Sequence, residues 1–446
     1  MSYAETRRHT LAKTRLAMVD GNLVENVRSE IGGTSVRRYE GGYWGFAAMP
    51  GDGATVAERV AGEAHANVRA MGRFGGRTPI GLAGGTHRGE HAHRGRPALG
   101  SAETVAVLAA LHAHIAGRYP GLGAVRMLMQ DERHEKRVAT SDGSETFNTI
   151  ARALLHVILV AEDDAGAPVE VWTSVTGKGS LADLDLSVSA LEPGLHAAHE
   201  HLQAKRHAVP ARAGLHTVVM GPELAGVLAH EAMGHPCEAD LVLAGAITGD
   251  LVGKPVASEL VTMIDYAHTV DGAEAMAPVY CDDEGTPSAD AVLIERGVLK
   301  GFMSSRETAA RLGIAPSGSA RAYAPADEPL VRMRNTAILA GTSQLDAMIA
   351  GVEDGYLLLK RTNGQADSTT EFMFGVGLGY EIRNGRLGRA IRDNTVSGSA
   401  LKVLSSVDAV SDDVFWSCAG YCGKKQPMVV SMGGPAIRCR AQLGGS

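Results

Sequence analysis

The chain has 446 residues, of which 45% are apolar and 21% charged, a composition typical of a globular protein with about two to three domains. Its net charge of −7 argues against dedicated binding to nucleic acid or to an anionic membrane, because both favour a basic surface. No apolar run approaches the roughly 18 residues of a membrane span. No secretory signal follows the opening MSYAETRRHT, and the five cysteines suit a reducing compartment, so we expect a cytoplasmic protein.

The first half of the chain alternates predicted helices with predicted strands. Residues 1–30 carry Ala12, Leu16, Val19 and Leu23 at helical spacing, which predicts a helix. The stretch GGTSVRRYEGGYWGFAAM alternates like a hairpin that turns at Gly41–Gly42. Further helices are expected over 53–73, 101–117 and 188–207, and strands in AVRMLMQDERHEKRVATSDG, ARALLHVILVAED and VEVWTSVTGKGSLADL. This order predicts an N-terminal α/β domain over residues 1–205.

The pattern changes after KRHAVPARAG, a polar stretch with Pro210 and Gly214 that indicates a linker. One predicted helix, GPELAGVLAHEAMGH, opens the second half. Short predicted strands follow at close spacing, punctuated by glycines and by the Asn384–Gly385 turn: LVTMIDYA, AVLIERGVLKGFM, YLLLKRT, EFMFGVGLGYEIRNGRLG and PMVVSMGG. We therefore predict a β-rich C-terminal domain over residues 206–446, and an α+β fold class for the whole chain.

The segment VLAHEAMGHPCEAD contains His230, Glu231 and His235 in an HExxxH pattern. In the familiar zinc-protease helix the two histidines are four residues apart and share one face. Here they are five apart, which on a straight α-helix places them roughly 140° apart, too far to bind one ion. Gly234 permits unusual dihedral angles, and Pro236 biases its predecessor away from α geometry. We expect the helix to open or end there and to bring His235 back toward His230.

A catalytic zinc site has three protein ligands and a fourth position for water, with a nearby carboxylate to accept a proton. His230 and His235 are candidates for two ligands, and Glu231 for the base. Spacing alone leaves the third ligand open. The candidates nearby in sequence are Glu238, Asp240 and Cys237, and those late in the chain are Cys418 and Cys422.

Other histidines cluster in GGTHRGEHAHRGRP, at His87, His91 and His93. A second metal site is one interpretation, but the polar, glycine-punctuated composition favours a solvated loop. No P-loop motif and no Gly-x-Ser-x-Gly elbow is present, which argues against nucleotide binding and serine-based catalysis.

Several motifs in order resemble those of the TldD/PmbA (TldD/TldE) metallopeptidase family. They are GGYWGFA, HEAMGHPCEAD, YCDDEGTPSADAVLIERGVLKGFMSS, VRMRNTAILAGT, YEIRNGRLGRAIRDNTVSGSALKVLSSVDAVSDD and the closing CGKKQPMVVSMGGPAIR. The likeness covers most of the chain and is strongest from about 215 to 446. Two stretches depart from the family pattern: CGKKQP is one glycine shorter than usual, and KRTNGQADSTTEFMF differs before its strand.

The resemblance implies a TldD-type subunit that binds zinc through His230, His235 and Cys422, with Glu231 as the general base. It also implies an N-terminal α/β region followed by a β-rich C-terminal domain. The resemblance further implies a homodimer, or a heterodimer with a TldE-like subunit, that encloses the active site and cleaves unfolded peptides. The alternatives are an N-deacetylase or amidase that acts on a small-molecule conjugate, and a non-catalytic partner subunit. Glu231 disfavours the last, because a structural zinc site needs no base.

Overall fold

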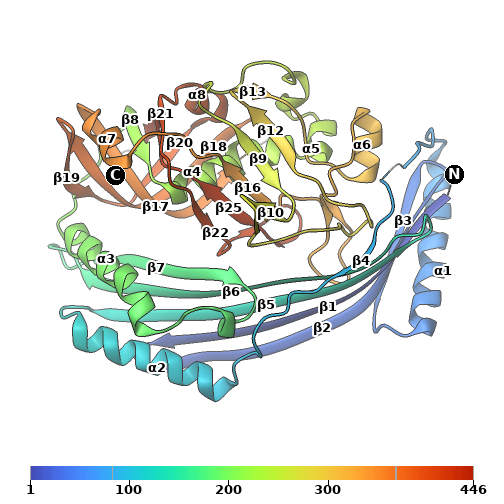
Figure 1. The fold of residues 1–446 in the computed structure, drawn as a ribbon, viewed down its shortest axis with the longest axis horizontal. Coiled ribbons are helices and arrows are strands. Elements are labelled where there is room, and N and C mark those ends of the chain that lie inside the picture. Colours follow the sequence, from blue (N-terminus) through green and yellow to red (C-terminus); the bar gives the residue numbers. More distant parts are fainter. Residues whose placement is uncertain (1, 83, 367–368, 445–446) are drawn as a thin grey trace.

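Long antiparallel strands from the N-terminal part of the chain curve beneath the C-terminal part, as the ribbon of the computed structural model shows (Figure 1). The structure describes residues 2–82, 84–366 and 369–444. The N-terminal elements are β1 (Ser2–Val19), β2 (Asn22–Glu40), β3 (Tyr43–Pro50), α1 (Ala54–Met71), β4 (Arg88–His91), α2 (Ser101–Arg118), β5 (Ala124–Thr140), β6 (Glu145–Glu162), β7 (Pro168–Lys178) and α3 (Val188–Arg206).

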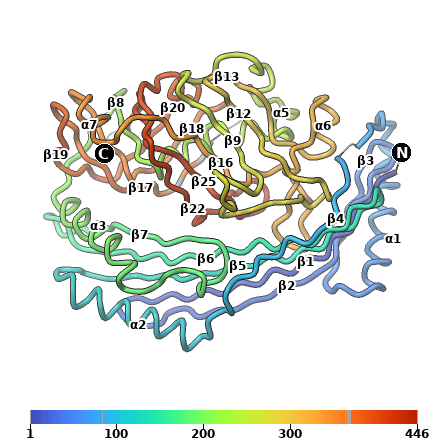
Figure 2. Tube along the Cα trace, viewed as in Figure 1, coloured from blue at the N-terminus to red at the C-terminus, as the bar shows by residue number. Residues whose placement is uncertain are grey.

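These strands form one sheet in the order β3-β2-β1-β5-β6, with both β4 and β7 paired to β6. The predicted helices and hairpin after residue 40 are present, including the turn at Gly41–Gly42, where both glycines have positive φ. Helices α2 and α3 bury Leu108, Leu111 and Leu195 in one cluster with side chains of the sheet. The tube in Figure 2 shows α1 near the N-terminal end of the molecule and α2 and α3 near the opposite end.

The helix predicted for residues 1–30 is wrong, because this segment forms β1 and the start of β2. Side chains at alternate positions of β1 are buried, as a strand requires. The buried positions include Glu5, Arg7 and His9 beside Leu11. Because charged residues occupy inward positions, the alternation of buried and exposed residues along the strand does not appear as an alternation of apolar and polar residues. The apolar residues happen to fall at helical spacing, which led to the wrong prediction.

The C-terminal part contains two larger sheets and short helices. Its elements are β8 (Gly214–Met220), α4 (Pro222–Leu228), α5 (Ala239–Leu243), β9 (Met263–Tyr266), β10 (Thr269–Val270), β11 (Ala273–Glu274), β12 (Ala291–Glu295), β13 (Val298–Leu299), α6 (Arg306–Leu312), β14 (Ala320–Arg321), β15 (Leu330–Val331), β16 (Asn335–Ile338), α7 (Leu345–Ala350), β17 (Asp354–Ala366), β18 (Glu371–Arg383), β19 (Arg386–Ile391), β20 (Asn394–Ser399), α8 (Ala400–Ser405), β21 (Ala409–Val410), β22 (Phe415–Ser417), β23 (Tyr421–Cys422), β24 (Met428–Val429), β25 (Ser431–Gly434) and β26 (Ile437–Leu443).

One sheet has the order β13-β12-β9-β16-β25-β22. The other runs β17-β8-β26-β20-β18-β19, and an added pairing of β17 with β18 closes five of its strands into a ring. The architecture confirms the α+β class. The division of the chain between residues 205 and 206 stays a prediction. Within the KRTNGQADSTTEFMF segment, Asp367 and Ser368 lie outside the described residues.

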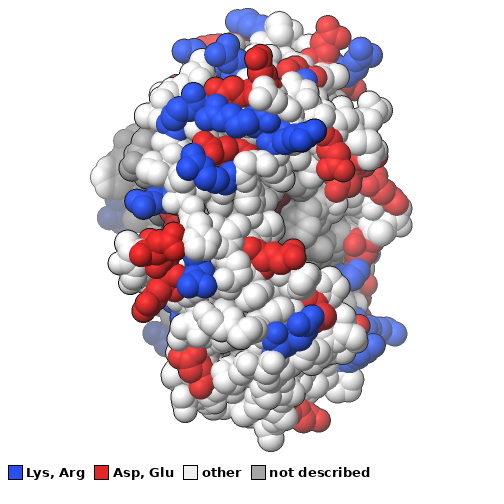
Figure 3. All heavy atoms as spheres, turned by 90° about the vertical axis from the view of Figure 1, so that its left-hand side faces the viewer, with Lys and Arg blue, Asp and Glu red and all other residues white. Residues whose placement is uncertain are grey.

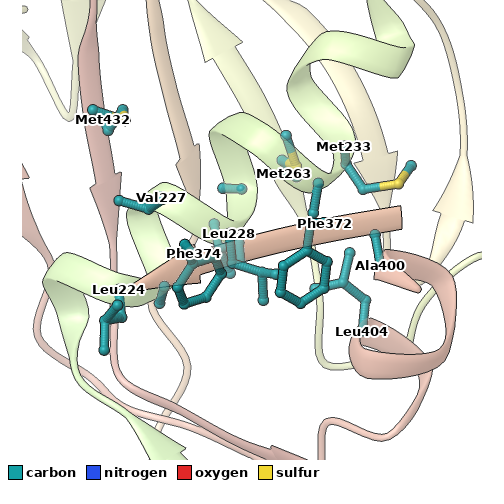
Figure 4. Packing of buried hydrophobic residues seen from close by; sticks show 14 of the residues in the cluster. Leu224, Val227, Leu228, Met233, Met263, Phe372, Phe374, Ala400, Leu404 and Met432 are labelled. Atoms are coloured by element: carbon teal, nitrogen blue, oxygen red, sulfur yellow. The ribbon is translucent and has the colours of Figure 1, made fainter. Parts of the chain in front are cut away.

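Helix α4 lies in the largest apolar core of the protein. Phe374 of β18 lies beside Leu224 and Leu228 of α4, and Phe372 lies beside Leu404 (Figure 4). The two phenylalanine rings stack with centroids 5.2 Å apart. Burial of a side chain of this size contributes about 1.5–3 kcal/mol, so this packing fixes α4 and the segment that follows it.

Buried ion pairs join the N-terminal sheet to the C-terminal loop Asp282–Gly285. Lys136 of β5 lies 2.6 Å from Asp283, and Arg7 of β1 lies 3.5 Å from the same carboxylate. Arg37 of β2 pairs with Glu284, whose backbone carbonyl also accepts the Tyr3 hydroxyl at 2.8 Å. Burial lowers the pKa of Lys136 to about 8 against the opposing effect of Asp283. The DDEG motif therefore docks the two parts of the chain.

Charged side chains of both signs are interspersed on the face that lies to the left in Figure 1, as the space-filling view in Figure 3 shows. Among the described residues, no helix combines the length and the apolar character needed to span a membrane.

Candidate metal centre

The HExxxH segment does not form one regular helix. α4 ends at Leu228, and Ala229–Gly234 forms a π-helical turn that passes into a 3₁₀ turn at His235–Cys237. The backbone N–H of His235 donates to the carbonyl of His230, five residues earlier. A π turn accommodates one extra residue, so residues five apart take the place that residues four apart hold on an α-helix. This is how the two histidines come together.

The expected local distortion is present, but the physical reason differs from the one that the sequence suggested. Gly234 and His235 both have ordinary right-handed helical dihedral angles. The glycine is required by packing instead, because a Cβ at position 234 would overlap Sδ of Met333. Met333 is fully buried, so the close approach of the two segments holds the wide turn in place.

His230, His235 and Cys422 meet at one point, with one donor atom from each lying within 4.8 Å of the others. The Cys422 Sγ lies 3.3 Å from His235 Nε2, across 187 residues of sequence. The two imidazole rings are nearly perpendicular, at 83°, with centroids 5.1 Å apart. Donor atoms of a tetrahedral zinc site are about 3.3–3.7 Å apart, given the usual bond lengths, and the distance from Cys422 Sγ to His235 Nε2 matches that spacing.

The chemistry of the three side chains also suits zinc, because imidazole and thiolate are its preferred protein ligands. Burial opposes ionisation of Cys422, but His230 and His235 outweigh it and hold the pKa of this thiol well below its usual value. Nδ1 of His230 is buried and has no hydrogen-bond partner among the described residues. A buried polar atom left in this way is costly unless another group completes its bonding.

A chain of buried charges orients His235. Its Nδ1 lies 2.8 Å from Oε2 of Glu238, and Lys424 Nζ lies 3.1 Å from the same oxygen. Burial would raise the pKa of Glu238, but Lys424 and His235 lower it to about 2, so the carboxylate stays ionised. Such a partner fixes the ring orientation of a ligating histidine and raises its basicity. The roles of Glu238 and Lys424 were missed by the sequence reasoning, although the spacing of three between His235 and Glu238 was a usable signal.

Glu231 lies on the π turn beside the three donors. Its Oε2 is 3.8 Å from His235 Nε2, and its side chain is 21% exposed. A Cβ on Gly364 of β17 would lie 3.8 Å from Cγ of Glu231. The carboxylate is thus close to the donor cluster but not enclosed by protein, as a proton-transfer group requires.

A cavity of about 570 Å³ lies between β6 and β7 of the N-terminal sheet and the C-terminal part. Its lining includes Trp172, Lys360, Arg361, Phe415 and Ala419. In sequence, Ala419 is three residues before Cys422, and Arg361 is three residues before Gly364, whose position on β17 faces Glu231. The two segments that reach the donor cluster therefore also line this cavity, although His230, His235 and Cys422 themselves do not.

The other candidates for the third ligand occupy different surroundings. Asp240 is 2.9 Å from Lys424, and Sγ of Cys418 is 3.8 Å from the carbonyl of Gly177. Burial raises the pKa of Cys237. Among the described residues, only His230, His235 and Cys422 form a group of three such donors.

The histidine-rich segment is not the solvated loop expected from composition, since residues 88–91 form β4 and the rings are partly buried. Nε2 of His87 lies 2.8 Å from Nε2 of His91, and the His91 ring stacks on Tyr280. His93 lies 3.8 Å from Asp183 instead. The segment thus supplies two adjacent histidines and no third donor within the described structure.

The chain is similar to proteins of one family. The model described as the PmbA/TldA metallopeptidase C-terminal domain matches residues 213–444. A metalloprotease of Methanothermobacter thermautotrophicus is 32% identical over 452 residues, which cover 100% of this chain and 96% of the relative. A zinc metalloprotease TldD homolog of Saccharolobus solfataricus is 30% identical over 72% of this chain and 71% of its own. The crystal structure of TldE from Thermococcus kodakarensis shares the fold, with a TM-score of 0.76, 15% identity and coverage of 98% of this chain and 96% of that one.

The packing at Gly234 gives a first prediction. Gly234→Ala places a methyl group against Met333, so we expect a loss of about 1–3 kcal/mol in the free energy of unfolding, measured by urea denaturation. Gly62→Ala is the matched control, because Gly62 lies inside α1 with open space around it and should become more stable by about 0.5–1 kcal/mol. Equal stability changes in the two variants would contradict the packing argument.

Proposed function

The chain belongs to the PmbA/TldD metallopeptidase family, and we propose that it is a zinc-dependent peptidase that acts on unstructured chains. Its membership agrees with the resemblance seen in the sequence motifs. The observation that carries the proposal is the convergence of His230, His235 and Cys422 beside Glu231. The relative from Saccharolobus solfataricus, named a zinc metalloprotease, supports zinc as the metal.

The protein residues have distinct roles in this proposal. His230, His235 and Cys422 hold the ion, which supplies Lewis acidity for a water and for an amide carbonyl. Glu231 accepts a proton from the attacking water and passes it to the leaving amine. Glu238 keeps the His235 ring in the orientation that directs Nε2 toward Cys422. Three protein ligands leave one position for substrate and water, as in catalytic rather than structural zinc sites.

The cavity between the N-terminal sheet and the C-terminal part supports an extended substrate. Its lining combines Trp172 and Phe415 with charged groups from Lys360 and Arg361, a mixture suited to side chains of varied character. Its volume of about 570 Å³ suits a few residues of a flexible chain rather than a folded domain. A folded substrate would first have to unfold, at a cost of roughly 5–15 kcal/mol.

Metal analysis tests the ligand set. The purified chain should hold about one zinc per molecule, and His230→Ala, His235→Ala and Cys422→Ser should each lose it while far-UV circular dichroism stays unchanged. Cys418→Ser is the matched control: this cysteine is only four residues away and fully buried, and it should keep its zinc. Equal zinc loss from both serine variants, or a zinc-free wild type after gentle preparation, would contradict the ligand assignment.

Glu231→Gln tests the proton transfer. The variant keeps the size of the side chain and removes its basicity, so zinc should stay bound while hydrolysis of an unfolded protein falls by about 10²–10⁴-fold. Product formation is measured by mass spectrometry on the folded and the denatured form of the same substrate. Undiminished turnover by the zinc-loaded variant, or equal cleavage of both substrate forms by the wild type, would show that the proposal is wrong.

An exposed edge of β2 supports assembly into a dimer. Residues 22–31 pair with β1 on one side and have no strand on the other side among the described residues. This stretch exposes Leu23, Val24, Val27 and Ile31, with Val24 at 61% and Val27 at 50%. A long open edge that exposes apolar side chains is a template for pairing with another strand. We propose that it pairs with the same edge of a second copy.

Self-pairing is compatible with the sequence of this edge. In an antiparallel pair centred on Val27, Leu23 faces Ile31 of the other copy, and Val27 faces its own equivalent. No two like charges are directly opposite in this register, because Glu25 faces Ser29 and Arg28 faces Asn26.

Light scattering tests the edge. We expect a dimer for the wild type and a monomer for Val27→Lys, because the change places two lysines directly opposite each other. Val292→Lys is the control, since Val292 is an exposed valine on β12, far from this edge in sequence. A dimeric Val27→Lys variant, or a wild type that pairs only with a different subunit, would rule out pairing through this edge.

A further inference from the structure

Two buried arginines hold the backbone that carries Cys422. The Arg332 guanidinium donates to the carbonyl of Cys422 at 2.6 Å, to that of Lys424 at 2.8 Å and to that of Gln426 at 2.7 Å. Arg152 donates to the carbonyls of Cys418 and Gly420, the latter at 2.7 Å. Alternate carbonyls from 418 to 426 thus accept from two side chains that are almost fully buried.

The two arginines come from different parts of the fold. Arg332 follows β15 in the C-terminal part, whereas Arg152 lies on β6 of the N-terminal sheet. The guanidinium of Arg152 also lies over the ring of Tyr421, 4.1 Å from the ring centroid. Its Nη2 lies 3.5 Å from the carboxylate of Glu132 on β5. The N-terminal sheet therefore contacts the residue directly before Cys422.

Glu132 completes this contact. Its carboxylate accepts the hydroxyl of Tyr421, and its other oxygen lies 2.8 Å from Nε2 of His134. Burial would raise the pKa of Glu132, but His134 and Arg152 lower it to about 2, so it carries a charge that balances Arg152. Tyr421 is thereby held between a buried cation and a buried anion, both from the N-terminal sheet.

We propose that Arg152 and Glu132 are positioning residues that place the Cys422 thiolate for the metal. This inference rests on the proposed function, because it takes Cys422 as a ligand. The two side chains bond neither to Cys422 Sγ nor to the candidate ligands His230 and His235. They act through the backbone of residues 418–420 and the ring and hydroxyl of Tyr421. The N-terminal sheet is then part of the metal centre, although it supplies no ligand.

The chemistry of arginine makes the proposal testable by a conservative change. A guanidinium donates to two carbonyls in fixed geometry and stacks on a ring, whereas an ammonium does neither in the same way. Arg152→Lys keeps the positive charge beside Glu132. It removes the planar guanidinium, which reaches the two carbonyls through Nη1 and Glu132 through Nη2. Loss of a group that orients a metal ligand costs about 10–100-fold in affinity.

The experiment compares full-length variants in two readouts. Zinc affinity is measured by competition with a chelator, and the geometry of the thiolate is followed by its charge-transfer absorption after cobalt(II) substitution. We expect Arg152→Lys to weaken zinc binding by about 10–100-fold and to reduce the thiolate-to-cobalt band. Arg126→Lys is the matched control: Arg126 lies on the neighbouring β5 in an exposed pair with Glu170, and both readouts should stay at wild-type values.

A second variant guards against misfolding of Arg152→Lys. Tyr421 is 41% exposed, so Tyr421→Phe should leave the fold intact while removing the hydroxyl that Glu132 accepts. A weaker zinc affinity with an unchanged melting temperature supports positioning. Wild-type affinity and a full cobalt band in Tyr421→Phe and in folded Arg152→Lys would overturn it. If instead the wild type shows no thiolate-to-cobalt band, or Cys422→Ser keeps one, the proposed metal site itself fails.

Discussion

The structure depends on the pairing of buried charges where the N-terminal sheet meets the C-terminal part. Lys136 and Arg7 converge on Asp283, and Arg37 pairs with Glu5 and Glu284. Removing one partner from such a set leaves an uncompensated charge and costs about 3–5 kcal/mol. The charges therefore constrain the relative placement of the two parts, because a displaced sheet would separate Lys136, Arg7 and Arg37 from Asp283 and Glu284.

This constraint reaches the candidate metal centre through neighbouring residues of the same strands. Lys136, which contacts Asp283, and Glu132, which contacts Tyr421, are four residues apart on β5 and point to the same side. Docking at the DDEG loop thus determines where Glu132 lies against the segment that carries Cys422. The histidines need no such help, because the π turn is fixed by the apolar packing of α4 and by Met333.

Much of the fold was predictable because most elements follow their apolar pattern. The helices at 53–73, 101–117 and 188–207 and the turn at Asn384–Gly385 rest on local signals, and the structure has them. The first strand was not predictable in this way. Its inward positions carry Glu5, Arg7 and His9, and their partners lie on other strands and loops: Arg37 for Glu5, Asp283 for Arg7 and His134 for His9. A pattern of hydrophobicity does not report a buried ion whose partner is distant.

The candidate metal centre likewise has some features that local sequence predicts and others that depend on distant residues. His230, Glu231 and His235 were visible because they are adjacent, and their spacing of five correctly implied a distorted helix. The form of the distortion was not visible, because it depends on Met333 packing against Gly234 from another segment. The choice between Cys418 and Cys422 came from a family motif and not from spacing. In space the two differ by which group each sulfur meets: Gly177 of the N-terminal part for Cys418, and His235 for Cys422. Arg152 of the N-terminal sheet donates to the carbonyls of Cys418 and Gly420, and Arg332 of the C-terminal part donates to that of Cys422, so both parts of the protein hold the segment between the two sulfurs.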